Sequence, residues 1–264
     1  MDASAREKAA SSLLDAVRDR VPIAALTETY DEVSIDDAYA IQLQQIEART
    51  THGRRVLGHK VGLTSAVVQR QLGVDQPDYG HLLDDMFYLE SSPIPMDRFI
   101  SPRIEPEIAF VLNKELSGPG VTTAEAIAAV DFVLPALEVI DSRIRDWKIA
   151  FEDTVADNAS SGAVVLGNHP TRLHDVDLRL VGCLLSRQGN VIATGAGGAV
   201  LGSPINVLVW LANTLGRREV ALKAGHIIMP GAVTGAVPVT SGDTVTATFG
   251  DLGSVTTQFI KENS

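Results

Sequence analysis

The sequence predicts an α+β fold, with a mixed, mainly β roll or barrel domain and an N-terminal helical cap. Helical patterning fills the first fifty residues, whereas strand-like segments dominate from about residue 53 onward. These strands do not alternate strictly with helices. Strict alternation is typical of a doubly wound sheet or a TIM barrel, so the pattern disfavours both of those folds.

Two helices are expected at the N-terminus. The segment 4–20 places its apolar residues on one stripe, and the segment 34–50 begins at Ser34, a suitable N-cap residue. A helical unit of this size buries too little apolar surface to form a core of its own. We therefore expect residues 1–52 to pack as a cap on a β domain formed by residues 53–264.

The remaining elements follow from short apolar runs bounded by Gly, Pro and Asp. The closing segment 242–259 alternates apolar and polar residues around a DLGS turn, which is typical of a hairpin. The segments 73–83 and 153–162 lack apolar periodicity and are expected to be loops. We expect strands near 56–63, 103–112, 132–141, 162–167, 178–186, 190–195, 226–230, 243–249 and 254–260, helices near 122–130 and 204–215, and a helical turn at 65–73.

Composition limits the classes of partner. With 22 basic and 33 acidic side chains the formal net charge is −11, which argues against nucleic acid or an anionic membrane as the main partner. Small anionic substrates stay possible, because a bound metal reverses the local charge. The single cysteine, Cys183, excludes an internal disulfide framework. The N-terminus has no continuous apolar segment typical of a signal peptide or membrane anchor, so we expect a cytoplasmic protein.

Several catalytic motifs are missing from the sequence. The glycine-rich segment 195–204 does not follow the G-x-G-x-x-G spacing and has no P-loop lysine, so it is interpreted as a flexible connection rather than a phosphate site. The chain contains neither a G-x-S-x-G elbow nor an H-E-x-x-H arrangement. These absences exclude the serine hydrolase and zincin interpretations.

Three isolated acids in apolar strands form a candidate metal site. In an extended chain Glu105 and Glu107 project from the same face, and Glu138 occupies a similar position in the segment 132–141. If the strands are neighbours, three carboxylates meet at one place, a ligand set that suits Mg²⁺ or Mn²⁺ rather than zinc. The alternative is that the first two line a solvated face and Glu138 pairs with an arginine such as Arg143. The spacing alone leaves both interpretations open.

Other polar residues are candidates for the active site, and each also has an ordinary structural interpretation. Lys60 lies in an apolar strand, where it either extends to water or is held in a site that lowers its pKa toward working pH. We expect the neighbouring His59 to be hydrogen-bonded or exposed rather than a ligand. Asp78 and Ser160 lie in the two expected loops, as turn residues or as groups that reach a pocket.

Five motifs taken in order resemble a known family. They are GHKVGLTS, LGVDQPDYGHLLDDM, PRIEPEIAFVL, LPALEVIDSRIRDW and DTVADNASSG, which together cover nearly the whole chain. This combination resembles the hydratase and decarboxylase branch of the fumarylacetoacetate hydrolase superfamily, and within it the hydratases of 2-hydroxypenta-2,4-dienoate.

The resemblance implies a fold, a cofactor and an activity. It implies a β roll or barrel with a flanking helical region, and Mg²⁺ or Mn²⁺ held by Glu105, Glu107 and Glu138. Lys60 and Asp78 match motifs that line the family's active site, and Ser160 lies in the matching substrate loop. The implied reaction is hydration of the dienoate to 4-hydroxy-2-oxopentanoate in meta-cleavage degradation of aromatic compounds, by a homo-oligomer that could associate with a pathway decarboxylase or aldolase.

Three other activities fit the same resemblance less well. A 4-oxalocrotonate decarboxylase would use the same metal site to release CO₂, and a hydratase of a longer dicarboxylic substrate would need an additional cation. A noncatalytic partner in a pathway complex would gain nothing from a cluster of repelling carboxylates. One departure is the segment 229–235, in which Pro230 occupies a place where many relatives have a threonine, so the resemblance supplies no hydroxyl contact to the substrate there.

Overall fold

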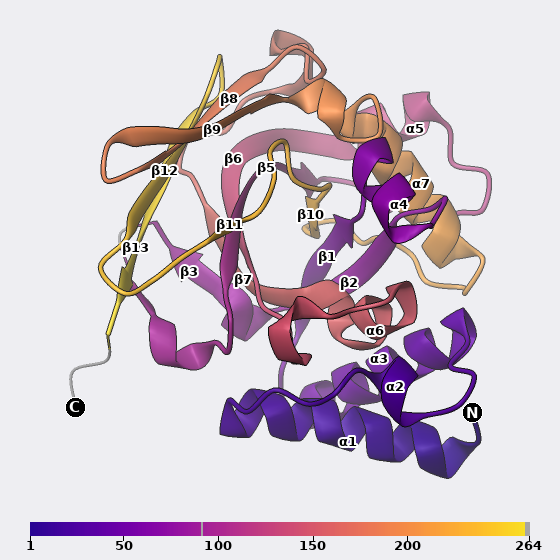
Figure 1. The fold of residues 1–264 in the computed structure, drawn as a ribbon. Coiled ribbons are helices and arrows are strands. Elements are labelled where there is room, and N and C mark those ends of the chain that lie inside the picture. The colour runs from indigo at the N-terminus through magenta and orange to yellow at the C-terminus, as the bar shows by residue number, and fades with distance from the viewer. Residues whose placement is uncertain (91, 262–264) are drawn as a thin grey trace.

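A computed structural model gives the fold, and it describes residues 1–90 and 92–261 (Figure 1). The helices are α1 (Ala3–Asp19), α2 (Leu26–Thr29), α3 (Ile35–Thr51), α4 (Ala66–Leu72), α5 (Thr123–Ala129), α6 (Phe151–Ala156) and α7 (Pro204–Gly216). The strands are β1 (Val56–Gly62), β2 (Asp78–Leu83), β3 (Phe87–Leu89), β4 (Ile94–Pro95), β5 (Arg103–Leu112), β6 (Val130–Ile140), β7 (Ser161–Leu166), β8 (Gly182–Arg187), β9 (Asn190–Ala196), β10 (Ile227–Met229), β11 (Val237–Pro238), β12 (Thr244–Phe249) and β13 (Gly253–Ile260).

The two predicted N-terminal helices are present as α1 and α3. The α3 helix begins with a capping box in which Ser34 and Asp37 exchange side-chain and backbone hydrogen bonds. The buried Asp37 carboxylate also pairs with Arg6 and with the N-terminal amine, which lies 3.0 Å away. These contacts fasten α1 to α3, and the two helices form a layer beneath the curled sheet in Figure 1.

The central sheet has eight strands in the order β2-β1-β10-β5-β6-β7-β3, with β11 paired to β5. It is mixed: β1 runs parallel to β10, whereas β5 runs antiparallel to both β10 and β6. The sheet curls into a half-barrel (Figure 1), which confirms the predicted mixed α+β class. Ile104 and Ile108 are fully buried on the face of β5 that the alternation assigns to the core.

A second sheet of five strands, in the order β4-β13-β12-β8-β9, packs on the first through contacts of β12 and β13 with β6. The predicted hairpin near the C-terminus is confirmed, because β12 and β13 pair antiparallel from Thr244 opposite Gln258 to Phe249 opposite Gly253. Helix α7 lies against α5. Most of the buried apolar side chains form one large cluster that draws on both sheets, and a smaller separate cluster includes Leu82, Ala136 and Val164 of the central sheet.

Three sequence predictions are wrong in detail. The expected loop 73–83 contains β2, whose residues are all buried, because Gly80 has no Cβ and so allows the carbonyl oxygen of Asn158 to approach. The expected loop 153–162 contains the end of α6 and a 3₁₀ turn, Asn158–Ser160. The strand expected at 178–186 begins later, at Gly182.

One segment meets a membrane-span criterion by length and composition alone. It covers Gly197–Gly216, and 44% of its most apolar stretch of 18 residues is buried inside the protein. Its α-helical part, α7, has 13 residues and so measures about 20 Å, shorter than a hydrocarbon core of about 30 Å. The helix buries Val207, Leu208 and Leu211 in the protein interior, as a core helix does.

Candidate metal centre and active site

The three predicted acids converge on one face of the central sheet. Glu105 on β5 lies directly opposite Glu138 on β6 in the antiparallel register, and Glu107 is the next residue of β5 on that face. One carboxylate oxygen from each lies within 4.8 Å of the other two. Glu107 and Glu138 are 1% and 0% exposed, and Glu105 is partly buried. The solvated face that the alternative interpretation requires is therefore not present.

Several oxygens of this cluster lack a hydrogen-bond partner in the described part of the chain. The backbone N–H of Gly231 donates a 2.8 Å hydrogen bond to Oε2 of Glu107 and so fixes that carboxylate. Among residues 1–90 and 92–261, Oε1 of Glu107 and both oxygens of Glu138 have no hydrogen-bond partner. A buried carboxylate without a partner costs several kcal/mol. Hard oxygen donors that converge in this way fit a divalent cation such as Mg²⁺ or Mn²⁺.

Lys60 belongs to the same cluster. It lies on β1, is 4% exposed, and its Nζ is 3.4 Å from Oε2 of Glu138. Its Nζ also donates a 2.9 Å hydrogen bond to the carbonyl oxygen of Ala159. Burial acts to lower the pKa of Lys60, but Glu138 and Asp78 raise it more, so the net shift is upward. The interpretation in which Lys60 extends to water is therefore wrong. Lys60 is held in a buried site, as in the alternative, but in the metal-free protein its pKa shifts upward rather than toward working pH.

Asp78 and Ser160 meet through a threonine. Asp78 is buried on β2, and Thr154 of α6 donates a 3.2 Å hydrogen bond to its Oδ2. The Thr154 hydroxyl also lies 3.5 Å from Oγ of Ser160. A Cβ at Gly62 would lie 2.3 Å from Oδ1 of Asp78, which is too close, so glycine at this position leaves room for that carboxylate. The same Cβ would lie 3.6 Å from Nζ of Lys60, which is an ordinary contact. Burial raises the pKa of Asp78, although Lys60 opposes the shift.

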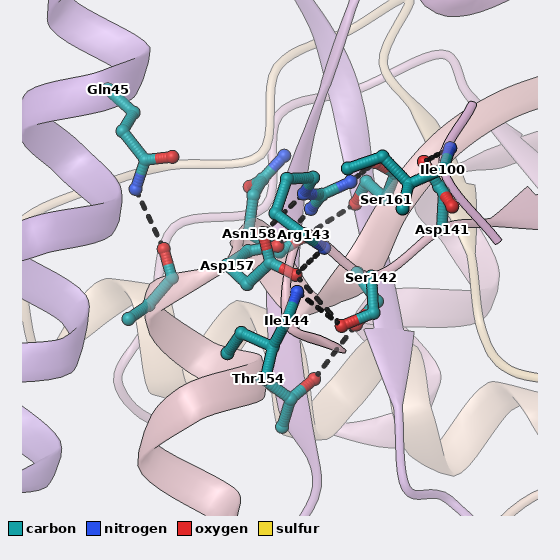
Figure 2. A network of polar contacts seen from close by, with 12 residues as sticks. Gln45, Ile100, Asp141, Ser142, Arg143, Ile144, Thr154, Asp157, Asn158 and Ser161 are labelled. Atoms are coloured by element: carbon teal, nitrogen blue, oxygen red, sulfur yellow. Dashed lines mark hydrogen bonds and ion pairs between the residues drawn. The ribbon is translucent and has the colours of Figure 1, made fainter. Parts of the chain in front are cut away.

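A buried ion pair holds the loop that carries Ser160. Figure 2 shows Arg143 bound to the carboxylate of Asp157, and Nη1 of Arg143 donates a 2.9 Å hydrogen bond to the carbonyl oxygen of Ser161. Residues 158–160 adopt φ angles between 50° and 55°, a left-handed conformation that non-glycine residues rarely adopt. Arg143 therefore fixes this strained turn and does not pair with Glu138, contrary to the alternative interpretation of the sequence.

An arginine on the strand face that carries the three glutamates was not among the candidate residues selected from the sequence. Arg103 precedes Glu105 by two residues on β5, and its guanidinium stacks over the ring of Trp147 at 4.4 Å. The indole N–H of Trp147 donates a 3.0 Å hydrogen bond to the carbonyl oxygen of Ser101, which fixes the ring. Arg103 places a positive charge on the face that carries the carboxylates, where a small anionic substrate would bind.

Comparison with known proteins identifies the family. The family model described as "Fumarylacetoacetate (FAA) hydrolase C-terminal" matches residues 56–260. The chain belongs to the fumarylacetoacetate hydrolase family. The matched range begins with β1 and ends with β13, so it contains both sheets and every candidate site residue of this family member.

Similar members of the fumarylacetoacetate hydrolase family include hydratases and a decarboxylase. A 2-keto-4-pentenoate hydratase of Paraburkholderia xenovorans (strain LB400) is 49% identical over 96% of this chain and 94% of that protein. A 2-oxo-hept-4-ene-1,7-dioate hydratase of Escherichia coli is 42% identical over 95% of this chain and 96% of that protein. Among solved structures, 4-oxalocrotonate decarboxylase from Pseudomonas putida G7, complexed with magnesium and adipate, has a TM-score of 0.96 and is 37% identical, over 98% of this chain and 99% of that chain.

Some site features of this fumarylacetoacetate hydrolase family member escaped sequence reasoning. Thr154 and Gly62 carry no signal of their own, because their contacts with Asp78 depend on how β2 packs against α6 and β1. Arg103 could have been predicted from the sequence. It precedes Glu105 by two residues on one strand, so strand alternation places the two side chains on the same face.

A first prediction concerns pH and metal. In the metal-free protein, burial raises the pKa of Glu105 to about 7, and it also raises the pKa of Glu107 and of Glu138. Because the folded protein holds the proton of Glu105 more tightly than the unfolded chain does, this carboxyl group adds stability to the folded state. That stability is complete below pH 4.5, the ordinary pKa, and is lost as pH rises through about 7. A divalent cation needs the ionised carboxylates. The increase in Tm on adding Mg²⁺ should therefore be larger at about pH 8 than at about pH 6.

Thermal melts with EDTA and with Mg²⁺ or Mn²⁺ at the two pH values test this expectation. The E107Q variant is the control, because it lacks one of the three anionic ligands and should show little metal-dependent shift at either pH. An equal shift of the wild-type Tm at both pH values would contradict the assignment of these carboxylates as metal ligands.

Proposed function

We propose that the protein is a divalent-metal-dependent hydratase that converts 2-hydroxypenta-2,4-dienoate to 4-hydroxy-2-oxopentanoate in the meta-cleavage degradation of aromatic compounds. The observation that carries the proposal is the cluster of Glu105, Glu107 and Glu138, with unpartnered oxygens, next to Lys60. The cluster occurs in a chain 49% identical to a 2-keto-4-pentenoate hydratase over 96% of its length.

The three glutamates are the proposed ligands of Mg²⁺ or Mn²⁺. A divalent cation bound there supplies a Lewis acid that stabilises negative charge on the C2 oxygen of a 2-oxo acid. The solved decarboxylase with magnesium and adipate, which shares this fold at a TM-score of 0.96, supports a divalent metal in this protein. Gly231 fixes Glu107 through its 2.8 Å hydrogen bond and leaves Oε1 of that carboxylate free to bind.

The protein's own groups move the protons. In the proposed reaction the enol oxygen at C2 loses its proton and C5 gains one, which gives 2-oxopent-3-enoate. Water then adds at C4, and C3 takes the second proton, which completes 4-hydroxy-2-oxopentanoate. We assign Lys60, which its carboxylate neighbours keep protonated, as a proton donor and Asp78 as the acceptor. Both groups lie close to the position that a Cβ of Gly62 would take, so both can face the same substrate.

Ser160 is the proposed contact to the substrate or the attacking water. Its hydroxyl lies 3.5 Å from that of Thr154, which in turn donates to Asp78, so a hydroxyl chain connects the loop to the proton acceptor. The Arg143–Asp157 pair, which Figure 2 shows, fixes this loop. We infer that the loop sets the orientation of Ser160 before substrate binds.

The second candidate is 4-oxalocrotonate decarboxylation, which uses the same stabilised C2 oxygen to release CO₂ instead of adding water. The high structural similarity to a decarboxylase favours it, and so does Arg103, a cation suited to a second substrate carboxylate. The hydratase interpretation is better supported, because two matching hydratases are 49% and 42% identical to this chain and the decarboxylase is 37% identical.

One assay separates the candidates. The purified protein is incubated with 2-hydroxypenta-2,4-dienoate and, separately, with 4-oxalocrotonate, each with Mg²⁺ and with EDTA. Consumption of the dienoate without CO₂ release, abolished by EDTA, is the expected result. Release of CO₂ from 4-oxalocrotonate at a higher kcat/KM would favour the decarboxylase, and inertness toward both substrates would favour a noncatalytic pathway partner.

The proposal also covers the domain organisation, the cellular location and the associations of the enzyme. We propose that residues 1–52 act as a cap on a catalytic domain formed by residues 53–264, and that the protein works in the cytoplasm as a homo-oligomer. Association with a pathway decarboxylase would deliver the reactive dienoate directly to this site, and association with an aldolase would pass on the 4-hydroxy-2-oxopentanoate product. Size-exclusion chromatography with light scattering, alone and with such a partner, tests both associations.

A further inference from the structure

A histidine cluster lies on the opposite face of the sheet from the carboxylates. Because neighbours in a strand point to opposite faces, His59 of β1 points away from the site that Lys60 enters. It lies directly opposite His81 of β2 in the register, with ring centroids 4.9 Å apart, and the ring of His226 is 5.8 Å from it. All three rings line a cavity of about 530 Å³.

His59 is the anomaly in this cavity. It is 2% exposed, and neither Nδ1 nor Nε2 has a hydrogen-bond partner in the described part of the chain. The sequence-based expectation of a hydrogen-bonded or exposed side chain is therefore wrong. A buried polar group without a partner destabilises the folded protein, so its retention needs an explanation. A ligand in the cavity supplies one.

The tautomer of His81 is fixed by its neighbour. Nε2 of Gln42 donates to the carbonyl oxygens of Tyr79 (3.0 Å) and Val155 (2.7 Å), which leaves its Oε1 as the acceptor. This Oε1 lies 2.9 Å from Nδ1 of His81, so Nδ1 carries the hydrogen and Nε2 carries the lone pair. A histidine that donates one ring N–H to the protein and offers the other nitrogen has the arrangement of a metal ligand.

His226 has the opposite arrangement. Its Nδ1 accepts a 3.2 Å hydrogen bond from the backbone N–H of Lys223, so in the neutral ring Nε2 carries the hydrogen. It therefore offers a donor to the cavity rather than a lone pair, and it suits a water or anion bound beside the site. The cavity also contains Glu47, whose carboxylate can balance a cation, and Lys223, which opposes it.

The protonation state agrees with a ligand role. Burial lowers the pKa of His59 well below its ordinary value and lowers the pKa of His81 to about 4. Both rings are therefore neutral near pH 7, and a metal ion does not compete with protons for them.

We propose that His59 and His81 bind a borderline transition-metal ion such as Cu²⁺, Zn²⁺ or Ni²⁺ in this cavity, separately from the carboxylate site. Imidazole nitrogen prefers these ions, whereas carboxylates prefer Mg²⁺ and Mn²⁺. Around a tetrahedral Zn²⁺ ion, two imidazoles at metal–nitrogen distances of about 2.0–2.1 Å have centroids roughly 5 Å apart, close to the 4.9 Å found here. A tetragonal Cu²⁺ or Ni²⁺ ion holds adjacent ligands at a smaller angle and would bring the two rings slightly closer. The cavity leaves room for water at the remaining positions. This inference is independent of the proposed reaction.

Copper binding to the E107Q variant tests the proposal, because that variant weakens the carboxylate site and keeps every histidine. We expect one Cu²⁺ per chain, with an electron paramagnetic resonance spectrum that shows hyperfine coupling to two imidazole nitrogens. Adding H59F to E107Q should weaken Cu²⁺ binding at least about 100-fold, since one of two ligands is lost. Adding H174F instead, which removes an imidazole whose side chain is 72% exposed, should leave Cu²⁺ binding unchanged.

If the H59F variant does not fold, the electron paramagnetic resonance spectrum of E107Q still tests the proposal, because E107Q keeps every histidine. H81F combined with E107Q then replaces H59F as the variant that lacks one ligand. The proposal is overturned if E107Q binds no Cu²⁺, if its spectrum shows no nitrogen coupling, or if H174F weakens binding as much as H59F. Changes in the NMR chemical shifts of the His59 and His81 ring protons on adding Zn²⁺ would support the proposal independently.

Discussion

Replacing Glu107 by glutamine should lower metal-dependent turnover by at least about 10³-fold while the chain stays folded. Glutamine keeps the size of the side chain and an oxygen that accepts the hydrogen bond from Gly231, but it removes one of three negative charges. Loss of a few kcal/mol of transition-state charge stabilisation corresponds to this factor. Because the three carboxylates repel one another in the metal-free protein, the substitution should not lower, and should tend to raise, the Tm measured in EDTA.

The measurements are kcat/KM with 2-hydroxypenta-2,4-dienoate, Mg²⁺ affinity by calorimetry, and Tm in EDTA. Glu7→Gln is the matched control, because Glu7 is exposed on α1 and the same chemical change there should alter none of the three quantities. Undiminished turnover of E107Q in EDTA would show that neither Glu107 nor a bound metal is needed for the reaction.

Strand alternation explains why part of this site could be predicted. Glu105 and Glu107 share a face by the two-residue period of an extended chain, which is a local property of the sequence. Glu138 is different, since its position depends on the pairing of β5 with β6, where it lies opposite Glu105. Spacing alone left an exposed face and an Arg143 pair open, and the resemblance to the family favoured the metal site.

The errors arise where tertiary contacts override local composition. The segment that contains Asp78 has the Gly, Pro and Asp content of a loop, yet it forms a buried strand because Gly80 admits the backbone of Asn158. The sign of the pKa shift of Lys60 could not be predicted either. Burial alone would lower that pKa, and the shift is reversed by the carboxylates that the fold places around Lys60, first Glu138 at 3.4 Å and then Asp78.

Replacing Lys60 by methionine should lower turnover about 10²–10⁴-fold and keep the metal site. Methionine fills a similar volume without a charge or a proton to donate, and general acid–base catalysis typically contributes a factor of this size. The three carboxylates are unchanged, so Mg²⁺ affinity at about pH 8 should stay within about tenfold of wild type. Lys8→Met, at an exposed position of α1, serves as the matched control, because it makes the same chemical change away from the site.

The pH dependence of metal binding gives K60M a signature that a purely structural role would not produce. Lys60 lowers the pKa of Glu105, Glu107 and Glu138, so its removal should shift the pH at which Mg²⁺ begins to stabilise the protein upward. E107Q should lose metal binding and turnover together, whereas K60M should lose turnover and retain metal. If K60M instead kept turnover within about threefold of wild type, the proton would have to come from another group, and Asp78, the other buried acid beside Gly62, would be the first to examine.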